Sequence, residues 1–290
     1  MSRFANQPTS PALDVEAPLD DASGLLRERY GTAASFAPER WNAILSTLAA
    51  HRSVRAYLPT ALPPDTLDLM IAAAQSASTS SNLQTWSVIA VEDPDRKARL
   101  SEMAGSQKHI RDCPLFLVWL ADLARIDRVA GEHDVAVAGL DYLEMLIVGI
   151  VDAALAAQNA VIAAESLGLG TVYIGGIRNK PEEVAAELGL PSRVMPVFGL
   201  CVGYPDPADP ASVKPRLPRT AVLHRERYSW DDQRPAIEAY DATLRDFFKG
   251  QGMETAPWTD TVIKRVRTPQ ALTGRDRIKE ALGNLGFVLK

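Results

Sequence analysis

The sequence is poor in the residues on which most metal and nucleic-acid proteins depend. Its 290 residues include 2 Cys and 4 His, and 31 Lys and Arg are outnumbered by 36 Asp and Glu, for a net charge of -5. The cysteines, Cys113 and Cys201, lie in separate apolar stretches, so we expect no metal site. The acidic balance excludes a global basic field for nucleic acid or an anionic membrane. Any anion must be bound locally.

Signals for export and for membrane insertion are also missing or weak. The N-terminus lacks the basic-then-apolar order of a signal peptide, and two buried thiols suit a reducing cytoplasm, so we expect a cytoplasmic protein. One apolar run, residues 145–164, is long enough to span a bilayer, but it contains Asp152, Gln158 and Asn159. We therefore expect a helix that protein buries on most sides, as in many subunit interfaces.

Common catalytic signatures are absent as well. The sequence contains no G-x-S-x-G, no GxxxxGK[ST] and no H-E-x-x-H, and its histidines show no metal-ligand spacing. The glycines of "GLGTVYIGG" precede a predicted strand, whereas those of a dinucleotide fingerprint follow one. Neither a side-chain nucleophile nor a Rossmann site is therefore expected.

Apolar patterns predict four strands separated by helices. The strands are expected at residues 86–93, 113–122, 170–177 and 196–205, and the second is a continuous apolar run typical of a central strand. Helices are expected from about Pro38, from Pro63, and at residues 93–105, 137–167, 180–190, 231–250 and 274–287. So few strands favour an α+β fold with a mixed sheet flanked by helices. Residues 1–37 are predicted to be a disordered leader and residues 38–290 a single domain.

Two short basic stretches, far apart in the sequence, could form one anion site. "HRSVR" contains His51, Arg52, Ser53 and Arg55, and in an extended chain Arg52 and Val54 face away from the others. "KPRLP" carries Lys214 and Arg216 on a segment that prolines stiffen. Together they offer charge-assisted donors to a phosphate. A solvated charge cluster and a proline-rich surface loop are the alternatives.

Three further segments offer groups suited to a flat heterocyclic ligand. The glycine pair after "TVYI" would let the backbone approach a ring closely, because no Cβ intervenes. Amides and hydroxyls in "STSSNLQTW" and "GSQKHI" could recognise its polar edge. Each segment alone is equally typical of an ordinary loop or a tight strand-end turn.

These segments, in this order, resemble the FMN-dependent nitroreductase family, and most of all its branch of oxygen-insensitive NADPH nitroreductases and flavin reductases. The resemblance runs from "HRSVR" through "SSNLQ", "GSQKH", "VDAALAAQNAVIAAESLGLGTVYIGGIRN", "FGLCVGYP" and "KPRLP" to "GNLGF" near the C-terminus. It implies a mainly antiparallel sheet, a long central helix that forms a subunit interface, and a homodimer that binds FMN tightly and non-covalently at that interface.

The resemblance also implies roles for individual residues. His51, Arg52, Ser53, Lys214 and Arg216 match the phosphate end of FMN, and Arg55 matches the cation at the N1/O2 edge of the flavin. Gln107, Ser80 and Asn82 match groups near the pyrimidine edge. Tyr173, Ile174, Gly175 and Gly176 match the backbone near N5, with Arg55 and Gly176 as the expected catalytic positions. Ser81, Arg178 and Arg275 match residues near NADPH or the substrate. Asn82 stands where near members carry an aromatic residue, which leaves the range of substrates open.

Three functions follow from this resemblance. The first is an FMN-dependent NAD(P)H oxidoreductase that reduces nitroaromatics, quinones or related small molecules by a two-electron ping-pong scheme. The second is an NADPH–FMN reductase that supplies reduced flavin. The third is a non-enzymatic flavin-binding protein whose leader docks a partner.

Overall fold

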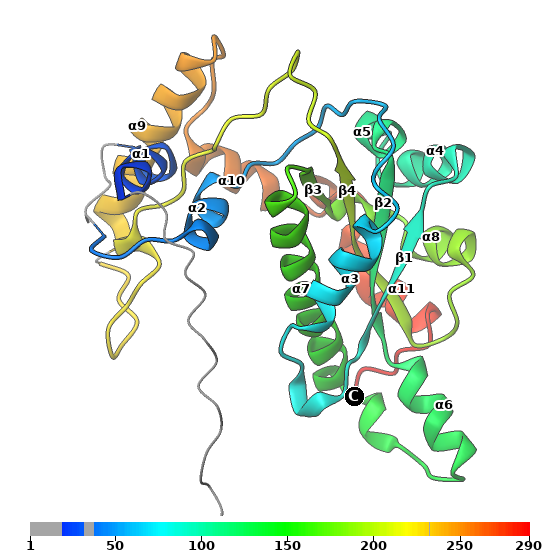
Figure 1. The fold of residues 1–290 in the computed structure, drawn as a ribbon. Coiled ribbons are helices and arrows are strands. Elements are labelled where there is room, and N and C mark those ends of the chain that lie inside the picture. Colours follow the sequence, from blue (N-terminus) through cyan, green and yellow to red (C-terminus); the bar gives the residue numbers. More distant parts are fainter. Residues whose placement is uncertain (1–18, 32–37, 232) are drawn as a thin grey trace, which may run out of the picture.

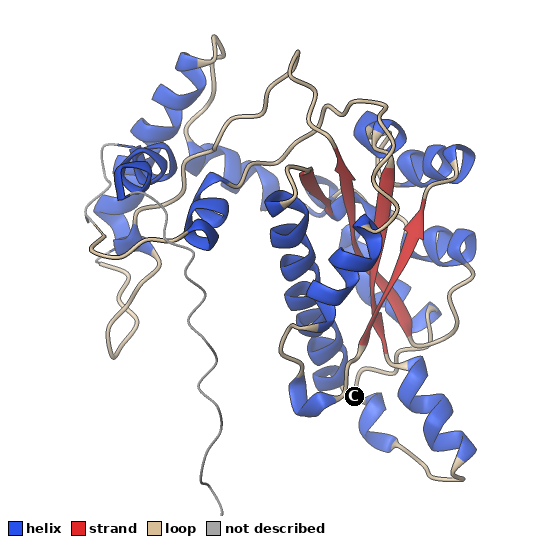
Figure 2. Ribbon diagram, viewed as in Figure 1, coloured by secondary structure: helices blue, strands red, loops and turns tan. Residues whose placement is uncertain are grey.

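A four-stranded antiparallel sheet forms the centre of the molecule (Figures 1 and 2). The computed structural model describes residues 19–31, 38–231 and 233–290. The strands lie in the order β1-β2-β4-β3. Their bounds are β1 (Trp86–Val91), β2 (Leu115–Asp122), β3 (Gly170–Ile174) and β4 (Val194–Gly203), and every neighbouring pair is antiparallel. The four predicted strands and the α+β class are confirmed.

Helices cover both faces of the sheet. From β2, Phe116 and Val118 pack toward α4 (Pro94–Met103), α5 (Lys108–Asp112) and α8 (Pro181–Leu188). Leu117 and Trp119 point the other way, toward α3 (Thr66–Gln75) and α7 (Leu143–Ser166). Because side chains alternate along a strand, the continuous apolar run that predicted a central strand serves both layers.

The long helix α7 is buried on one side and open on the other. Its length and composition would allow it to cross a membrane. On its inner side, small residues such as Gly149, Ala153 and Ala157 let it lie close to the sheet. Its exposed large apolar residues are Leu143, Ile147, Val151 and Leu155, spaced four apart on one face. Burial on most sides, as the sequence predicted, would require a second chain against this face.

A helical lobe stands beside the sheet, and the sequence predicted it poorly. It contains α1 (Leu19–Tyr30), α2 (Ala43–Ala50), α9 (Gln233–Gly250) and α10 (Trp258–Val266) (Figure 1). The predicted disordered leader is wrong for α1, where Ala22 and Leu26 are buried one helical turn apart. Its remaining parts, residues 1–18 and 32–37, lie outside the described residues.

Other helix predictions were wrong in detail. α2 begins at Ala43, not near Pro38, because the Asn42 side chain accepts a hydrogen bond from the Leu45 amide and caps the helix there. The short α6 (Ala124–Glu132) and α10 were not predicted. The C-terminal α11 (Ile278–Asn284) is shorter than the 274–287 that was expected.

Among the connections between the lobe and the sheet, two carry the basic stretches. Residues 51–60 run from α2 toward α3, and residues 204–218 run from β4 back to the lobe, so that both cross the same gap between ribbons in Figure 1. Leu58 donates its backbone amide to Tyr204 over 2.9 Å, which holds the two connections side by side. The fold therefore brings together two segments that are distant in sequence.

Candidate functional site

The first basic stretch pairs with the edge of the sheet through an isolated bridge. Ser53 forms a parallel bridge with Thr171 of β3, and the Val54 amide donates to the Thr171 carbonyl over 2.9 Å. Val54 is buried directly over Gly170, where an added Cβ would lie 2.6 Å from a Val54 methyl group. Because the stretch runs parallel to β3, Arg55 lies further toward the Gly175-Gly176 end of that strand.

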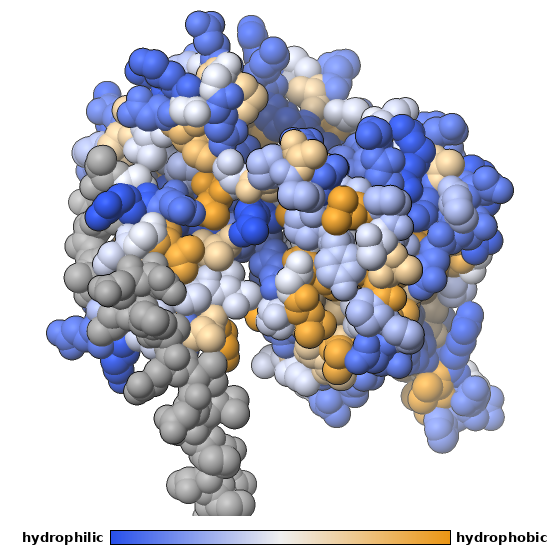
Figure 3. All heavy atoms as spheres, turned by 45° about the horizontal axis from the view of Figure 1, so that its top comes forward, coloured by the Kyte–Doolittle hydropathy of each residue, from blue (hydrophilic) through white to orange (hydrophobic). Residues whose placement is uncertain are grey.

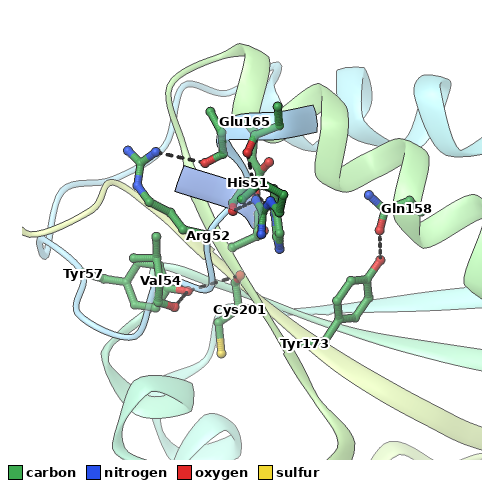
Figure 4. A network of polar contacts seen from close by, with 12 residues as sticks. His51, Arg52, Val54, Tyr57, Gln158, Glu165, Tyr173 and Cys201 are labelled. Atoms are coloured by element: carbon green, nitrogen blue, oxygen red, sulfur yellow. Dashed lines mark hydrogen bonds and ion pairs between the residues drawn. The ribbon is translucent and has the colours of Figure 1, made fainter. Parts of the chain in front are cut away.

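His51 anchors this stretch to α7. Its Nδ1 lies 2.6 Å from Glu165 Oε1, and the Thr171 hydroxyl donates to the same oxygen over 3.2 Å (Figure 4). Glu165 is the last acidic residue of α7, so this contact ties the helix, the basic stretch and β3 together. The sequence gave no signal for the role of Glu165.

Arg52 lies on the other side of the stretch. With Val54 it lines a cavity of about 320 Å³ that also includes Thr47, Glu165 and Gly170, as the expected alternation of side chains implies. A guanidinium nitrogen of Arg52 donates to the Ala50 carbonyl over 3.3 Å (Figure 4). The structure does not group Arg52 with the other cations, and its place at the phosphate end stays a prediction.

The second basic stretch is held by α9. The Tyr240 hydroxyl donates to the Pro215 carbonyl over 2.9 Å, and Lys214 Nζ lies 5.2 Å from the centre of the Phe248 ring. Within the described residues, the Arg216 side chain donates to the backbone carbonyls of Lys214 and Pro215. Aromatic side chains thus fix the stretch without neutralising its charges.

The two stretches converge on one positively charged cluster. Burial, and then the charges of Arg55 and Arg216, lower the pKa of Lys214. Throughout the described ranges, no carboxylate forms an ion pair with Arg55, Lys214 or Arg216. Unpaired like charges held together repel one another, and a bound anion would relieve this repulsion. The cluster is therefore suited to a phosphate group.

Arg55 links this cluster to the predicted edge-recognition loop. Burial, and then Arg55, lower the pKa of His109. His109 Nε2 lies 3.0 Å from Gln107 Oε1, and Gln107 Nε2 donates to the Ala104 carbonyl over 2.8 Å. Gln107 therefore contacts an imidazole whose lowered pKa, set by burial and by the charge of Arg55, favours the neutral form.

Gly176 is required where the strand-end turn meets this loop. A Cβ at Gly176 would lie 2.4 Å from the Ala104 carbonyl oxygen and 2.5 Å from Gln107 Nε2. Any larger residue would push the two segments apart. The loop and the glycine pair, predicted separately from the sequence, are thus packed directly on each other.

The neighbouring residues of the turn carry two more cations. A Cβ at Gly175 would meet Arg178 at 3.5 Å and Arg275 at 3.6 Å. Arg178 donates to the Val197 carbonyl, and burial, followed by the charge of Arg275, lowers its pKa. Ile174 is buried, whereas Tyr173 is exposed and contacts Phe198 edge-on, with its hydroxyl 3.4 Å from Gln158 Oε1 (Figure 4).

Ser80, Ser81 and Asn82 lie away from the His51–Glu165 contact of the same chain. Their loop is bound to Asp152, whose carboxylate accepts the Thr79 hydroxyl at 2.5 Å and the Ser80 amide at 3.1 Å. Asp152 precedes Glu165 by roughly four turns of α7, which is about 20 Å along the helix axis. Within one chain the loop thus lies away from the end of α7 that contacts His51, and its place near the pyrimidine edge stays a prediction.

The described residues contain no group of side chains suited to bind a metal ion. Among the residues that the structure describes, no three His, Cys, Asp or Glu side chains are grouped so as to hold a metal ion. The two thiols, Cys113 and Cys201, are free and buried. The cluster instead offers the cations of arginine and lysine, the side-chain amide of Gln107, and backbone that a ligand can approach closely at Gly175-Gly176.

Comparisons with known proteins agree with this geometry. The model of the nitroreductase family matches residues 48–204, and that of its C-terminal domain matches residues 214–290. An FMN reductase (NADPH) of Bacillus subtilis is 40% identical over 246 residues, which cover 82% of this chain and 97% of that protein. An oxygen-insensitive NADPH nitroreductase of Salmonella typhimurium is 39% identical over 229 residues, covering 77% and 92%.

Solved structures show the same fold. NfrA2 of Bacillus megaterium superposes with a TM-score of 0.81 at 40% identity, over 86% of this chain and all of that one. The NADPH:FMN oxidoreductase of Vibrio harveyi, solved with NAD+, superposes with a TM-score of 0.75 at 32% identity and the same coverage of this chain. With two family models that together span most of the sequence, the chain belongs to the nitroreductase family.

Proposed function

We propose that the protein is an FMN-dependent NADPH oxidoreductase that reduces small molecules such as nitroaromatics or quinones. The observation that carries the proposal is the unpaired cation cluster of Arg55, Lys214 and Arg216, set beside the packed turn at Gly176. A phosphate-bearing, flat cofactor fits this combination of charge and close backbone. The names of the relatives, FMN reductase and NADPH nitroreductase, agree with it.

The residues divide into two groups along the proposed cofactor. Lys214 and Arg216, with Ser53 and His51 beside them, would hold the phosphate, while Arg55 and Gln107 would face the polar edge of the ring. The backbone from Tyr173 to Gly176 would lie along the ring. When bound, FMN supplies the two-electron redox chemistry, so the protein itself needs no nucleophile.

Arg55 then stabilises charge instead of transferring a proton. A guanidinium stays positive at every working pH, and it stands ready where reduction adds negative charge, with no reorganisation required. The imidazole of His109 beside it is kept neutral by burial and by Arg55 itself. Arg178 and Arg275 supply positive charge for the phosphates of NADPH at the open side of Gly175.

We further propose a cytoplasmic homodimer that binds FMN tightly and non-covalently at the subunit interface. The exposed apolar stripe of α7 and the exposed Ile44, Leu45 and Leu48 of α2 support such an interface. In the space-filling view, hydrophobic residues lie on both sides of the hollow between the helical lobe and the sheet (Figure 3). In this dimer, Ser80, Ser81 and Asn82 of one protomer would complete the site of its partner.

Steady-state kinetics test the proposed reaction. NADPH oxidation is measured at several concentrations of a nitrofuran acceptor under anaerobic conditions. We expect parallel lines in the double-reciprocal plot, because NADP+ leaves before the acceptor binds. Intersecting lines would reject the alternating scheme, and an absence of turnover with nitrofurans, quinones and free FMN would reject the enzyme.

A flavin reductase is the second candidate. It is favoured by one observation, the 40% identity to a protein named FMN reductase over nearly the whole length of that protein. Turnover with free FMN is compared with turnover with a nitrofuran at equal NADPH. A larger kcat/KM for free FMN assigns the flavin reductase, and a larger value for the nitrofuran assigns the nitroreductase.

A further inference from the structure

Helix α1 lies outside the part of the chain that the family accounts for. The family models begin at residue 48, whereas α1 ends at Tyr30. The Bacillus megaterium structure is matched in full by 86% of this chain, so the chain carries additional residues. Arg29, near the end of this added helix, is only 9% exposed. A buried arginine on an added segment calls for a physical reason.

The Arg29 side chain contacts both basic stretches. Its Nη1 donates to the Lys214 carbonyl over 3.0 Å, and its Nη2 donates to the carbonyls of Ala49 and His51 over 2.9 and 2.5 Å. Its own backbone carbonyl accepts the Arg216 amide over 2.9 Å. A single residue therefore fixes the spacing between the segment at 49–51 and the segment at 214–216.

The charge of Arg29 adds to that of the cluster. All three side-chain acceptors are neutral carbonyls, and across the described ranges no carboxylate forms an ion pair with it. Burial, and then Arg216, lower the pKa of Arg29, while Tyr30, Glu165 and Glu28 act against this. A buried cation placed beside other cations is unfavourable unless an anion binds nearby.

We propose that Arg29 is a positioning residue for the FMN phosphate. It holds the backbones of the two basic stretches at the separation that phosphate binding requires. Its positive charge adds to the charges of Lys214 and Arg216, which would bind the phosphate. The added helix α1 is then part of the cofactor site and not an independent appendage. This inference rests on the proposed function and concerns the phosphate end of the cofactor alone.

Selectivity between FMN and riboflavin tests this role, since riboflavin lacks the phosphate. Apoprotein of wild type and of Arg29→Gln is titrated with each flavin, and binding is followed by quenching of flavin fluorescence. We expect Arg29→Gln to lower the preference for FMN over riboflavin by about tenfold. Arg29→Lys, which keeps the charge, should recover part of the preference, and Arg27→Gln on the exposed face of α1 should leave it unchanged.

A merely structural role would give a different result. General loosening of the lobe would weaken the binding of both flavins equally. An unchanged preference for FMN over riboflavin therefore overturns the proposal, whether or not the affinity falls. If the wild-type apoprotein binds neither flavin, the proposed function itself fails. A wild type that binds FMN, with variants of equal preference, rejects only the role of Arg29.

A second measurement needs no variant and remains available if Arg29→Gln does not fold. Hydrogen exchange of α1 is compared in wild-type protein without flavin, with riboflavin and with FMN. Coupling between two sites is reciprocal, so a phosphate that depends on Arg29 must in turn protect α1. We expect FMN to slow exchange in residues 22–30 more than riboflavin does. Equal protection by both flavins overturns the proposal.

Discussion

Arg55 connects the phosphate cluster to the part of the site that would contact the flavin ring. It affects both Lys214 on one side and His109 on the other, yet it makes no ion pair with a described residue. A cation that forms no ion pair with a described residue is free to respond to charge on a ligand. Its main effect should therefore be on the reduction of the cofactor.

Replacing Arg55 should slow chemistry more than it weakens binding. Arg55→Gln removes a charge that matters most once the flavin is reduced, so we expect the rate of reduction by NADPH to fall about tenfold or more. FMN affinity should change less. Arg216→Gln, at the proposed phosphate end, should show the reverse pattern, with lower FMN retention and normal reduction. Anaerobic stopped-flow on flavin-loaded protein, with FMN titrations, separates the two, and full activity of both variants would contradict the site.

Lys214 should make FMN binding sensitive to alkaline pH. Burial, then Arg55 and Arg216, lower its pKa in the apoprotein, whereas a bound phosphate favours the charged form and raises that pKa again. FMN affinity should be highest at pH values below the lowered pKa of Lys214. It should fall as pH rises through that pKa, which lies below the ordinary value of about 10.4 for lysine. FMN and riboflavin titrations across this range measure the effect.

The matched control is Lys214→Arg, because a guanidinium stays charged throughout this pH range. It should bind FMN with little pH dependence, and riboflavin binding should be flat in both proteins. An FMN affinity that falls equally in wild type and Lys214→Arg would show that another group titrates.

Among the elements, the loop at residues 79–85 is held by the side chain of Asp152. The Asp152 carboxylate, 2% exposed, accepts hydrogen bonds from Thr79, from the Ser80 amide and from both the amide and hydroxyl of Thr85. Ser81, Asn82 and Gln84 in this loop adopt positive φ, which is unfavourable for residues with a Cβ. The carboxylate therefore holds a strained loop in place.

Asp152→Asn should release this loop. The new side-chain amide would place an N–H donor next to the N–H and O–H groups of Thr79, Ser80 and Thr85, which need an acceptor. We therefore expect a loss of stability of about 1–3 kcal/mol. Limited proteolysis should cut first within residues 79–85, and urea unfolding should give the change in stability. Glu144→Gln, which removes an exposed carboxylate from the same helix, serves as a control for a changed charge. An Asp152→Asn variant with wild-type stability and an uncut loop would refute this assignment.

Sequence patterns predicted the elements that have a strong apolar pattern or clear boundary residues in the local sequence. Strand β2 was predicted because burial on both faces produces a continuous apolar run. Strands β3 and β4 were predicted because glycine and proline bound them in the sequence. Helix α1 was missed because half of its residues are polar or charged, and because the partners of its Arg29, the carbonyls of residues 49, 51 and 214, are distant in sequence. No local pattern can report such contacts.

The same distinction applies to the candidate site. Its residue types could be predicted, since the two basic stretches and the glycine pair stand out in the sequence. Their convergence depends on the edge pairing of Ser53 with Thr171 and on the two connections that cross from the lobe. Asp152 was read only as a charge unsuited to a membrane, and Glu165 was not singled out, because their partners lie far away in sequence.

At the scale of the whole molecule, the exposed apolar faces support the proposed homodimer. Ile147, Val151 and Leu155 of α7 are each nearly half exposed, a large apolar area for an isolated protein. The loop with Ser80 and Asn82 also lies too far along α7 to join the cation cluster of its own chain. A homodimer would resolve both features at once.

A charge on this face should separate the protomers and reduce cofactor content together. Ile147→Glu would bury an unpaired carboxylate in the proposed interface, so we expect monomers in light scattering and lower FMN occupancy after purification. Val129→Glu, a similarly exposed site on α6, is the control. A dimeric Ile147→Glu with full occupancy would place the interface elsewhere, and a monomer that keeps its FMN would remove the loop from the partner's site.

The central claim is that two distant basic stretches close around one FMN whose ring remains open to NADPH. It is tested most directly by the absorbance spectrum of apoprotein mixed with FMN, recorded before and after anaerobic NADPH. We expect FMN to stay with the protein through gel filtration, at one per chain, and its visible absorbance to be lost when NADPH is added. A protein that takes up no FMN, or whose colour survives NADPH, would contradict the account.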